Sequence, residues 1–220
     1  MPPTSKTLEE KLRAAPAEML WEERLLLYTL VRGLKPKRVL EIGVYHGGST
    51  AIISDALDQN GCGMLSSIDP HPDLKIDWES VAHRVVLYRG YSPAILKEVH
   101  DAAGGHFDFC FIDADHSYGG VLRDAIGVMP YMAPGSYILF HDAHFADINA
   151  AIDDFLLTRT GITDCGILST ERSGLDSEGR GPWGGLRLVR VRSTTGFSAP
   201  AVISRGVRFL RKRLRLSFKG

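Results

Sequence analysis

Short apolar runs alternate with amphipathic stretches along most of the chain. Helical spacing of apolar residues recurs in five stretches, at 18–32, 49–57, 92–103, 121–129 and 148–158. Between them lie apolar segments of a length typical of buried strands, at 38–43, 64–68, 84–88, 107–112, 135–140 and 185–191. Because strands separated by helices form βαβ units, this pattern predicts an α/β fold with a mostly parallel sheet.

The charges of the chain balance in number but not in position. The 26 basic and 26 acidic side chains cancel, which argues against a nucleic-acid partner. No acidic residue follows Glu178, however, whereas eleven Arg and Lys residues do. We therefore expect a globular domain over 1–198, with a helical segment at 1–34, followed by a basic tail over 199–220. The apolar and basic residues of the tail alternate as in an amphipathic helix. Such a helix either packs against the acidic surface of the protein itself, which we favour, or lies on an anionic membrane.

Cysteine content and hydropathy indicate the compartment. The three cysteines form no CxxC pair and cannot close a disulfide framework, which suits a reducing environment. The first residues contain no apolar core of a secretory signal, and no apolar run reaches the roughly 20 residues that span a bilayer. We therefore expect a cytoplasmic protein without stable membrane insertion.

Acidic residues stand at or near the ends of four predicted strands. They are Glu41, Asp69, Asp113 and Asp142. A single acid in such a place is commonly a helix cap or turn residue. Ligands of an open α/β sheet bind outside the carboxyl ends of its strands, so four acids in matching places predict one shared binding crevice.

The first strand leads into a glycine-rich loop, VLEIGVYHGGS over 39–49, that opens a helix. The loop does not fit the GxGxxG pattern of dinucleotide-binding proteins. Glu41 would repel a phosphate but suits a cationic amine, and Asp69 suits the two hydroxyls of a ribose. An amine and a ribose without a phosphate describe S-adenosylmethionine (SAM).

The segment LEIGVYHGGS is similar to motif I of class I SAM-dependent methyltransferases, in the form found in catechol O-methyltransferase-like enzymes. With the later motifs, the resemblance covers residues ~20–160. It implies a Rossmann-like fold with a mostly parallel seven-stranded sheet and helices on both faces. The cofactor-binding residues that it implies are Glu41, Gly43, Tyr45, Gly47, Ser49, Asp69, Tyr91, Ser92 and Asp113.

Two further segments, FDFCFIDADH at 107–116 and SYILFHD at 136–142, resemble the strand-four and strand-five motifs of metal-dependent O-methyltransferases. The resemblance implies that Asp113 and Asp142 hold a divalent cation, Mg²⁺ or Mn²⁺. His141, or Ala143 if the register slips by one residue, replaces an oxygen ligand of the family. We include His141 in the predicted metal site; an imidazole either shifts the preference towards Mn²⁺, Co²⁺ or Zn²⁺ or stays outside the coordination shell.

Three residues are candidates for the base that accepts the proton of the hydroxyl. His144 is the leading candidate because it follows Asp142 by two residues. His116 stands where catechol-type enzymes have a lysine, and Asp115 stands where macrolide- and aminocoumarin-type sugar O-methyltransferases have an aspartate. The sequence alone does not decide which of the three is the base.

The acceptor follows from resemblance alone. The chain looks like actinobacterial sugar O-methyltransferases, such as those of methylmannose polysaccharides, and like the related cephalosporin-hydroxylase-like group. We therefore expect methylation of a small-molecule sugar or an oligosaccharide, for example a mannoside, by a homodimer. The alternatives are an O-methyltransferase of catechols or phenols and a SAM-binding module without catalysis.

Overall fold

A computed structural model describes residues 6–175, 179 and 181–193. The strands in these residues are β1 (Arg38–Ile42), β2 (Met64–Ile68), β3 (Val85–Tyr88), β4 (Phe107–Ile112), β5 (Met132–Phe140), β6 (Ile162–Ile167) and β7 (Arg187–Val191). The helices are α1 (Leu8–Ala14), α2 (Trp21–Leu34), α3 (Gly48–Asn60), α4 (Leu96–Ala103), α5 (Tyr118–Val128) and α6 (Ala146–Thr158), with 3₁₀ turns η1 (Trp78–Ser80) and η2 (Met129–Tyr131).

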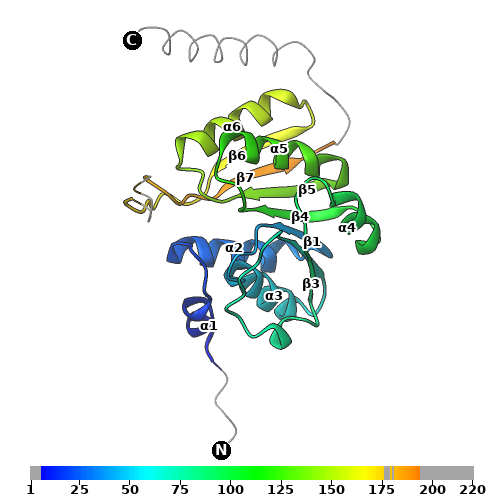
Figure 1. Cartoon of the computed structure of the whole chain (residues 1–220), viewed down its shortest axis with the longest axis vertical. Coiled ribbons are helices and arrows are strands. Elements are labelled where there is room, and N and C mark those ends of the chain that lie inside the picture. The colour runs from blue at the N-terminus through cyan, green and yellow to red at the C-terminus, as the bar shows by residue number, and fades with distance from the viewer. Residues whose placement is uncertain (1–5, 176–178, 180, 194–220) are drawn as a thin grey trace, which may run out of the picture.

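All seven strands belong to one sheet, in the order β3-β2-β1-β4-β5-β7-β6 (Figure 1). Pairing is parallel from β3 to β5, and β7 runs antiparallel to both of its neighbours. The predicted mostly parallel, seven-stranded α/β fold is therefore confirmed.

Helices cover both faces of the sheet. α1, α2 and α3 lie on one face and α4, α5 and α6 on the other (Figure 1), and a separate hydrophobic cluster fills each layer. Along β4, Phe109 and Phe111 belong to the first cluster, whereas Cys110 and Ile112 belong to the second. Because both faces are buried, these strands read as continuous apolar runs in the sequence.

The sequence pattern missed one strand and misplaced some boundaries. β6 is an edge strand whose sequence, ITDCGI, is largely half-exposed or exposed, so it lacks the apolar signal of the buried strands. The N-terminal segment over 1–34 contains α1 as well as α2; α1 is a helix of 7 residues that begins with a capping box formed by Thr7 and Glu10. The predicted helix at 92–103 begins only at Leu96.

The predicted boundary at residue 198 and the basic tail over 199–220 lie outside the described residues. Among the residues that are described, no helix is long and apolar enough to cross a membrane.

Candidate active site

A cavity of about 1000 Å³ opens at the carboxyl ends of β1, β2, β4 and β5. This is the region in which an open α/β sheet binds its ligands. Most of the predicted site residues line it: Gly43, Tyr45, Ser49, Asp69, Tyr91, Ser92, Asp113, Asp115, His116, His141 and Asp142. Three predicted residues, Glu41, Gly47 and His144, are not part of its lining.

The glycine loop between β1 and α3 passes directly against the end of β4. A Cβ atom at Gly43 would lie 1.8 Å from the carbonyl oxygen of Asp113, and the φ of Gly43 is +93°. Only glycine fits this close approach and this left-handed conformation. Gly47, with φ +82°, caps the N-terminus of α3 in the same conformation. The loop thus brings bare backbone to the floor of the cavity.

Asp69 holds the glycine loop in place from the end of β2. Its Oδ2 accepts hydrogen bonds from the backbone N–H groups of Val44 and Tyr45, each at 2.9 Å, and its Oδ1 accepts one from the N–H of His71 at 2.7 Å. A carboxylate offers about four acceptor positions, so Asp69 retains capacity for a ligand. Its side chain lines the cavity, and its contact with the ribose stays a prediction.

Glu41 lies behind the cavity wall. Side chains alternate along β1, so Glu41 points to the face covered by α3, where it is fully buried. The hydroxyls of Ser49, Thr50 and Ser67 donate hydrogen bonds to its carboxylate at 2.6, 2.7 and 2.6 Å. Burial raises the pKa of Glu41 to about 7 in spite of these three donors. Glu41 thus braces the start of α3, and its contact with the cofactor amine stays a prediction.

Two polar side chains, Ser92 and Asp124, lie on the side of the cavity formed by the loop after β3 and by α5. Ser92 Oγ and Asp124 Oδ1 are buried, and neither has a hydrogen-bond partner of normal geometry among the described residues. Burial raises the pKa of Asp124 to about 6. Buried polar groups are normally paired, so this end of the cavity suits a polar ligand. Nothing in the helical sequence around Asp124 distinguished it from an exposed polar residue.

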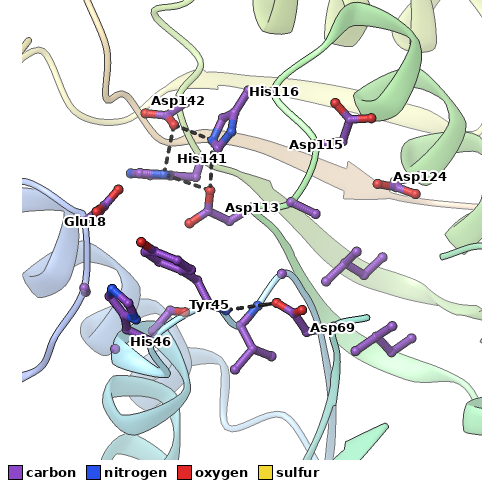
Figure 2. A pocket seen from close by; sticks show the side chains of 18 of the residues that line it. Glu18, Tyr45, His46, Asp69, Asp113, Asp115, His116, Asp124, His141 and Asp142 are labelled. Carbon is purple, nitrogen blue, oxygen red and sulfur yellow. Dashed lines mark hydrogen bonds and ion pairs between the residues drawn. The ribbon is translucent and has the colours of Figure 1, made fainter. Parts of the chain in front are cut away.

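The ends of β4 and β5 bring together Asp113, His116, His141 and Asp142, which we call the acid–histidine cluster (Figure 2). His116 Nε2 lies 2.8 Å from Asp142 Oδ2 and 3.5 Å from Asp113 Oδ1. His141 Nδ1 lies 3.2 Å from Asp113 Oδ1 and 3.6 Å from Asp142 Oδ2. Asp142 has a φ of 55°, a strained conformation of the kind that gathers at functional sites.

Charge is concentrated in this cluster. Hydrogen bonds to Asp113 and Asp142 raise the pKa of His116 to about 10. Burial works to lower the pKa of His141, but the same two carboxylates outweigh it and hold that pKa well above its usual range. Burial likewise opposes the ionisation of Asp113, yet His141 and His116 keep its pKa below the usual range. The two carboxylates of the acid–histidine cluster are therefore stabilised by positive charge placed beside them.

Three of these residues also fit a metal ion. Asp113, His141 and Asp142 each offer a ligand atom, and these atoms lie within 4.8 Å of one another. His141 Nδ1 is buried and has no hydrogen-bond partner of normal geometry within the described part of the chain. Two carboxylate oxygens and one imidazole nitrogen are a suitable donor set for a divalent transition ion.

The three candidate bases occupy different places. His144 Nε2 lies 3.2 Å from the carbonyl oxygen of Ser169, away from the cavity lining. Asp115 lines the cavity, but its Oδ1 accepts a hydrogen bond from the N–H of Ser117 at 2.9 Å at the start of α5. His116 both lines the cavity and contacts the predicted metal ligands. The geometry favours His116 over His144.

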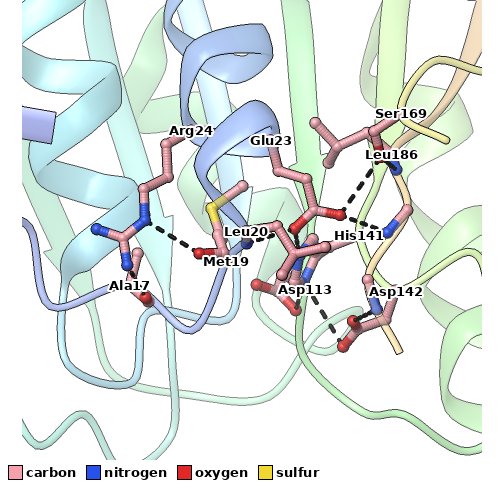
Figure 3. Close-up of polar contacts among 12 residues, drawn as sticks. Ala17, Met19, Leu20, Glu23, Arg24, Asp113, His141, Asp142, Ser169 and Leu186 are labelled. Carbon is pink, nitrogen blue, oxygen red and sulfur yellow. Dashed lines mark hydrogen bonds and ion pairs between the residues drawn. The ribbon is translucent and has the colours of Figure 1, made fainter. Parts of the chain in front are cut away.

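The N-terminal helices contribute to the site in a way that the sequence did not indicate. Residues 16–19 line the cavity. The guanidinium group of Arg24 holds this segment by donating to the carbonyl oxygens of Ala15, Ala17 and Met19 (Figure 3). The neighbouring Glu23 contacts His141. In sequence, both residues belong to a charged stretch that resembles an ordinary solvated helix face.

Comparisons with known proteins agree with this architecture. Residues 40–143 match a family model described as a methyltransferase domain. Among solved structures, the chain is similar to an O-methyltransferase from Bacillus cereus in complex with SAH, with 20% identity, a TM-score of 0.64, and coverage of 87% of this chain and 93% of that chain. No curated protein sequence matches the chain significantly.

Two further structures show the same fold. The O-methyltransferase TomG from Streptomyces achromogenes, which is involved in tomaymycin synthesis and was solved with SAM, has 19% identity and a TM-score of 0.63, with 86% of this chain and 92% of that chain covered. A putative O-methyltransferase from Klebsiella pneumoniae has 20% identity and a TM-score of 0.59, with coverage of 86% and 92%. At these identities the likeness establishes the fold.

Proposed function

Since the methyltransferase domain match and the fold together support a SAM-dependent O-methyltransferase, we propose that this chain methylates a hydroxyl group of a sugar or oligosaccharide, with a divalent cation bound at the acceptor site. One observation carries the proposal: a single cavity joins the glycine loop and Asp69 to the acid–histidine cluster. The first part provides a cofactor site, and the second provides the groups that an acceptor hydroxyl needs.

The cofactor lies along the glycine loop in this proposal. Asp69 receives the ribose hydroxyls, and Tyr45 and Ser49 stand near the methionine part. The adenine lies towards Tyr91 and Ser92, where the buried Ser92 Oγ and Asp124 Oδ1 offer hydrogen bonds to its polar edge. The methyl group then faces the acid–histidine cluster, which lines the same cavity as Tyr45 and Asp69 (Figure 2).

Methyl transfer is an in-line displacement. The acceptor oxygen forms a bond to the methyl carbon while the carbon–sulfur bond breaks, and its electron pair stays on sulfur, which leaves S-adenosylhomocysteine. The hydroxyl proton passes to His116, whose ring lines the cavity beside Asp142. Asp115 remains the alternative base at the same opening.

Asp113, His141 and Asp142 would hold the cation. When bound, it supplies positive charge that acidifies a nearby hydroxyl and offsets the carboxylate charge that keeps His116 protonated. The protein itself contributes the arrangement of the ligands.

The walls of the cavity favour a sugar as acceptor. Glu18 and Asp115 place carboxylates on its lining, and sugar hydroxyls donate hydrogen bonds to such groups. Trp183 lies on the lining as well, and an indole offers an apolar face for a sugar ring. A volume of about 1000 Å³ exceeds the needs of the cofactor alone.

Incubation of the protein with SAM and a panel of mannosides, other sugars and catechols tests the proposal. We expect a sugar product that is heavier by one CH₂ unit in mass spectrometry. Methylation of catechols alone would overturn the sugar assignment and keep the O-methyltransferase. Tight SAM binding with no methylated product from any acceptor would leave a SAM-binding module without catalysis.

A further inference from the structure

Glu23 links the first layer of helices to the acid–histidine cluster. It lies in α2, 118 residues before His141 in the sequence, and is fully buried. Its Oε2 lies 3.1 Å from His141 Nε2 (Figure 3). A buried carboxylate in this place contacts the side of the imidazole that faces away from Asp113 and Asp142.

The remaining partners of Glu23 among the described residues are all hydrogen-bond donors. The N–H of Leu20 donates to Oε2 at 2.8 Å, and the N–H of Gly185 donates to Oε1. The hydroxyl of Ser169 lies 3.4 Å from Oε1. A group surrounded by donors acts as an acceptor, so Glu23 is a carboxylate and His141 Nε2 is the atom that donates to it.

This arrangement determines what the opposite ring nitrogen presents. A cation bound beside Asp113 and Asp142 would take the place of the proton that these carboxylates otherwise hold on Nδ1. The ring would then keep its remaining proton on Nε2 and present the Nδ1 lone pair to the ion. His141 Nδ1 is the buried atom without a hydrogen-bond partner of normal geometry, and it faces Asp113 Oδ1 and Asp142 Oδ2 at 3.2 and 3.6 Å. Carboxylate–histidine–metal arrangements of this kind orient the ring and increase its basicity as a ligand.

We propose that Glu23 is a positioning residue that presents His141 Nδ1 as a metal ligand, and that the site therefore prefers Mn²⁺, or another borderline ion such as Co²⁺ or Zn²⁺, over Mg²⁺. The reason is chemical: Mg²⁺ takes oxygen ligands and dehydrates reluctantly, whereas imidazole suits borderline transition ions. The proposal deepens the proposed function and rests on it for the presence of a resident cation.

The first experiment compares Mn²⁺ binding by isothermal titration calorimetry in the full chain and in two variants. Glu23→Gln keeps the shape of the side chain but has one acceptor oxygen, so its amide cannot satisfy both Gly185 and His141. We expect Mn²⁺ affinity to fall by about 10- to 100-fold, which is typical for the loss of a residue that orients a metal ligand. Glu22→Gln is the matched control, because Glu22 precedes Glu23 in α2 and is exposed. Affinity in Glu23→Gln equal to that of the control would overturn the proposal.

A second variant keeps the test independent of the folding of Glu23→Gln. His141→Asn replaces the nitrogen ligand with an amide oxygen, so the ratio of Mn²⁺ to Mg²⁺ affinity should fall by about tenfold. An unchanged ratio would show that His141 does not bind the ion and would overturn the inference. Methyl transfer is measured separately: a chain that binds Mn²⁺ through His141 but never transfers a methyl group refutes the proposed function alone.

Discussion

The two halves of the cavity satisfy their carboxylates in different ways. In the glycine-loop half, both oxygens of Glu41 accept bonds from hydroxyls, and both oxygens of Asp69 accept bonds from backbone N–H groups. In the acid–histidine half, Asp113 and Asp142 face two imidazoles, and His141 Nδ1 has no partner of normal hydrogen-bond geometry among the described residues.

This difference indicates that the two halves bind their ligands in different ways: one is preorganised, and the other carries charge that a cation can neutralise. The glycine-loop half is fixed before any ligand binds, because fixed backbone donors hold Asp69 and the loop together. The acid–histidine half gathers negative charge whose repulsion is relieved by protonated imidazoles or by a cation. We therefore expect the first half to determine cofactor affinity and the second half to determine turnover.

Chelation should separate the two halves most strongly. Exhaustive treatment with a chelator should abolish methyl transfer, and added Mn²⁺ should restore it, because the cation offsets the charge of Asp113 and Asp142. SAM affinity, measured by calorimetry on the same sample, should change little. Full turnover after chelation would refute a catalytic cation and leave these aspartates as orienting groups.

His116→Ala should lower kcat by roughly 10²- to 10⁴-fold, which is the usual contribution of a positioned general base. SAM affinity should stay within the error of the wild-type value. His144→Ala is the matched control, since the His144 ring lies outside the cavity lining and contacts Ser169. A larger loss of kcat in His144→Ala than in His116→Ala would reverse the assignment.

Asp69→Ala should weaken SAM binding, because Asp69 lies in the glycine-loop half of the cavity. Losing a charged acceptor of backbone hydrogen bonds costs about 1.5–3 kcal/mol, which corresponds to a SAM affinity about 10- to 100-fold weaker. The exposed Asp73, which pairs with Lys75 at 2.9 Å, provides the control variant Asp73→Ala. Equal SAM affinity in the two variants, measured by calorimetry, would remove Asp69 from the cofactor site.

The smallest effect concerns stability and Glu41. Its pKa is raised from 4.5 to about 7, so between these values the folded protein holds a proton that the unfolded chain releases. The contribution of Glu41 to the free energy of unfolding is therefore fully present below its unfolded pKa of 4.5 and is lost as the pH rises to its folded pKa of about 7. Between these values the loss is about 1.4 kcal/mol per pH unit. Urea unfolding at several pH values should show this slope in the wild type and a smaller slope in Glu41→Gln. Identical slopes would mean that Glu41 is ionised in the folded state.

The sequence by itself determined the layout of the sheet and the edge at which the site lies. Apolar runs separated by helices predict parallel pairing, and the ends of those runs identify Asp69, Asp113 and Asp142, all of which line the cavity. It did not place Glu41, because β1 is buried on both faces and its apolar run carries no sign of which face a side chain occupies.

Only the tertiary structure decided which residues complete the cluster. Glu23 reaches His141 across 118 residues, and no local pattern encodes such a contact. The choice between His116 and His144 depends on the turn after β5, where Asp142 adopts a φ of 55°. Asp142 lines the cavity there, whereas His144 contacts Ser169 outside the lining. Sequence spacing gives the distance along the chain, but the direction of a side chain after a turn depends on backbone dihedrals that packing imposes.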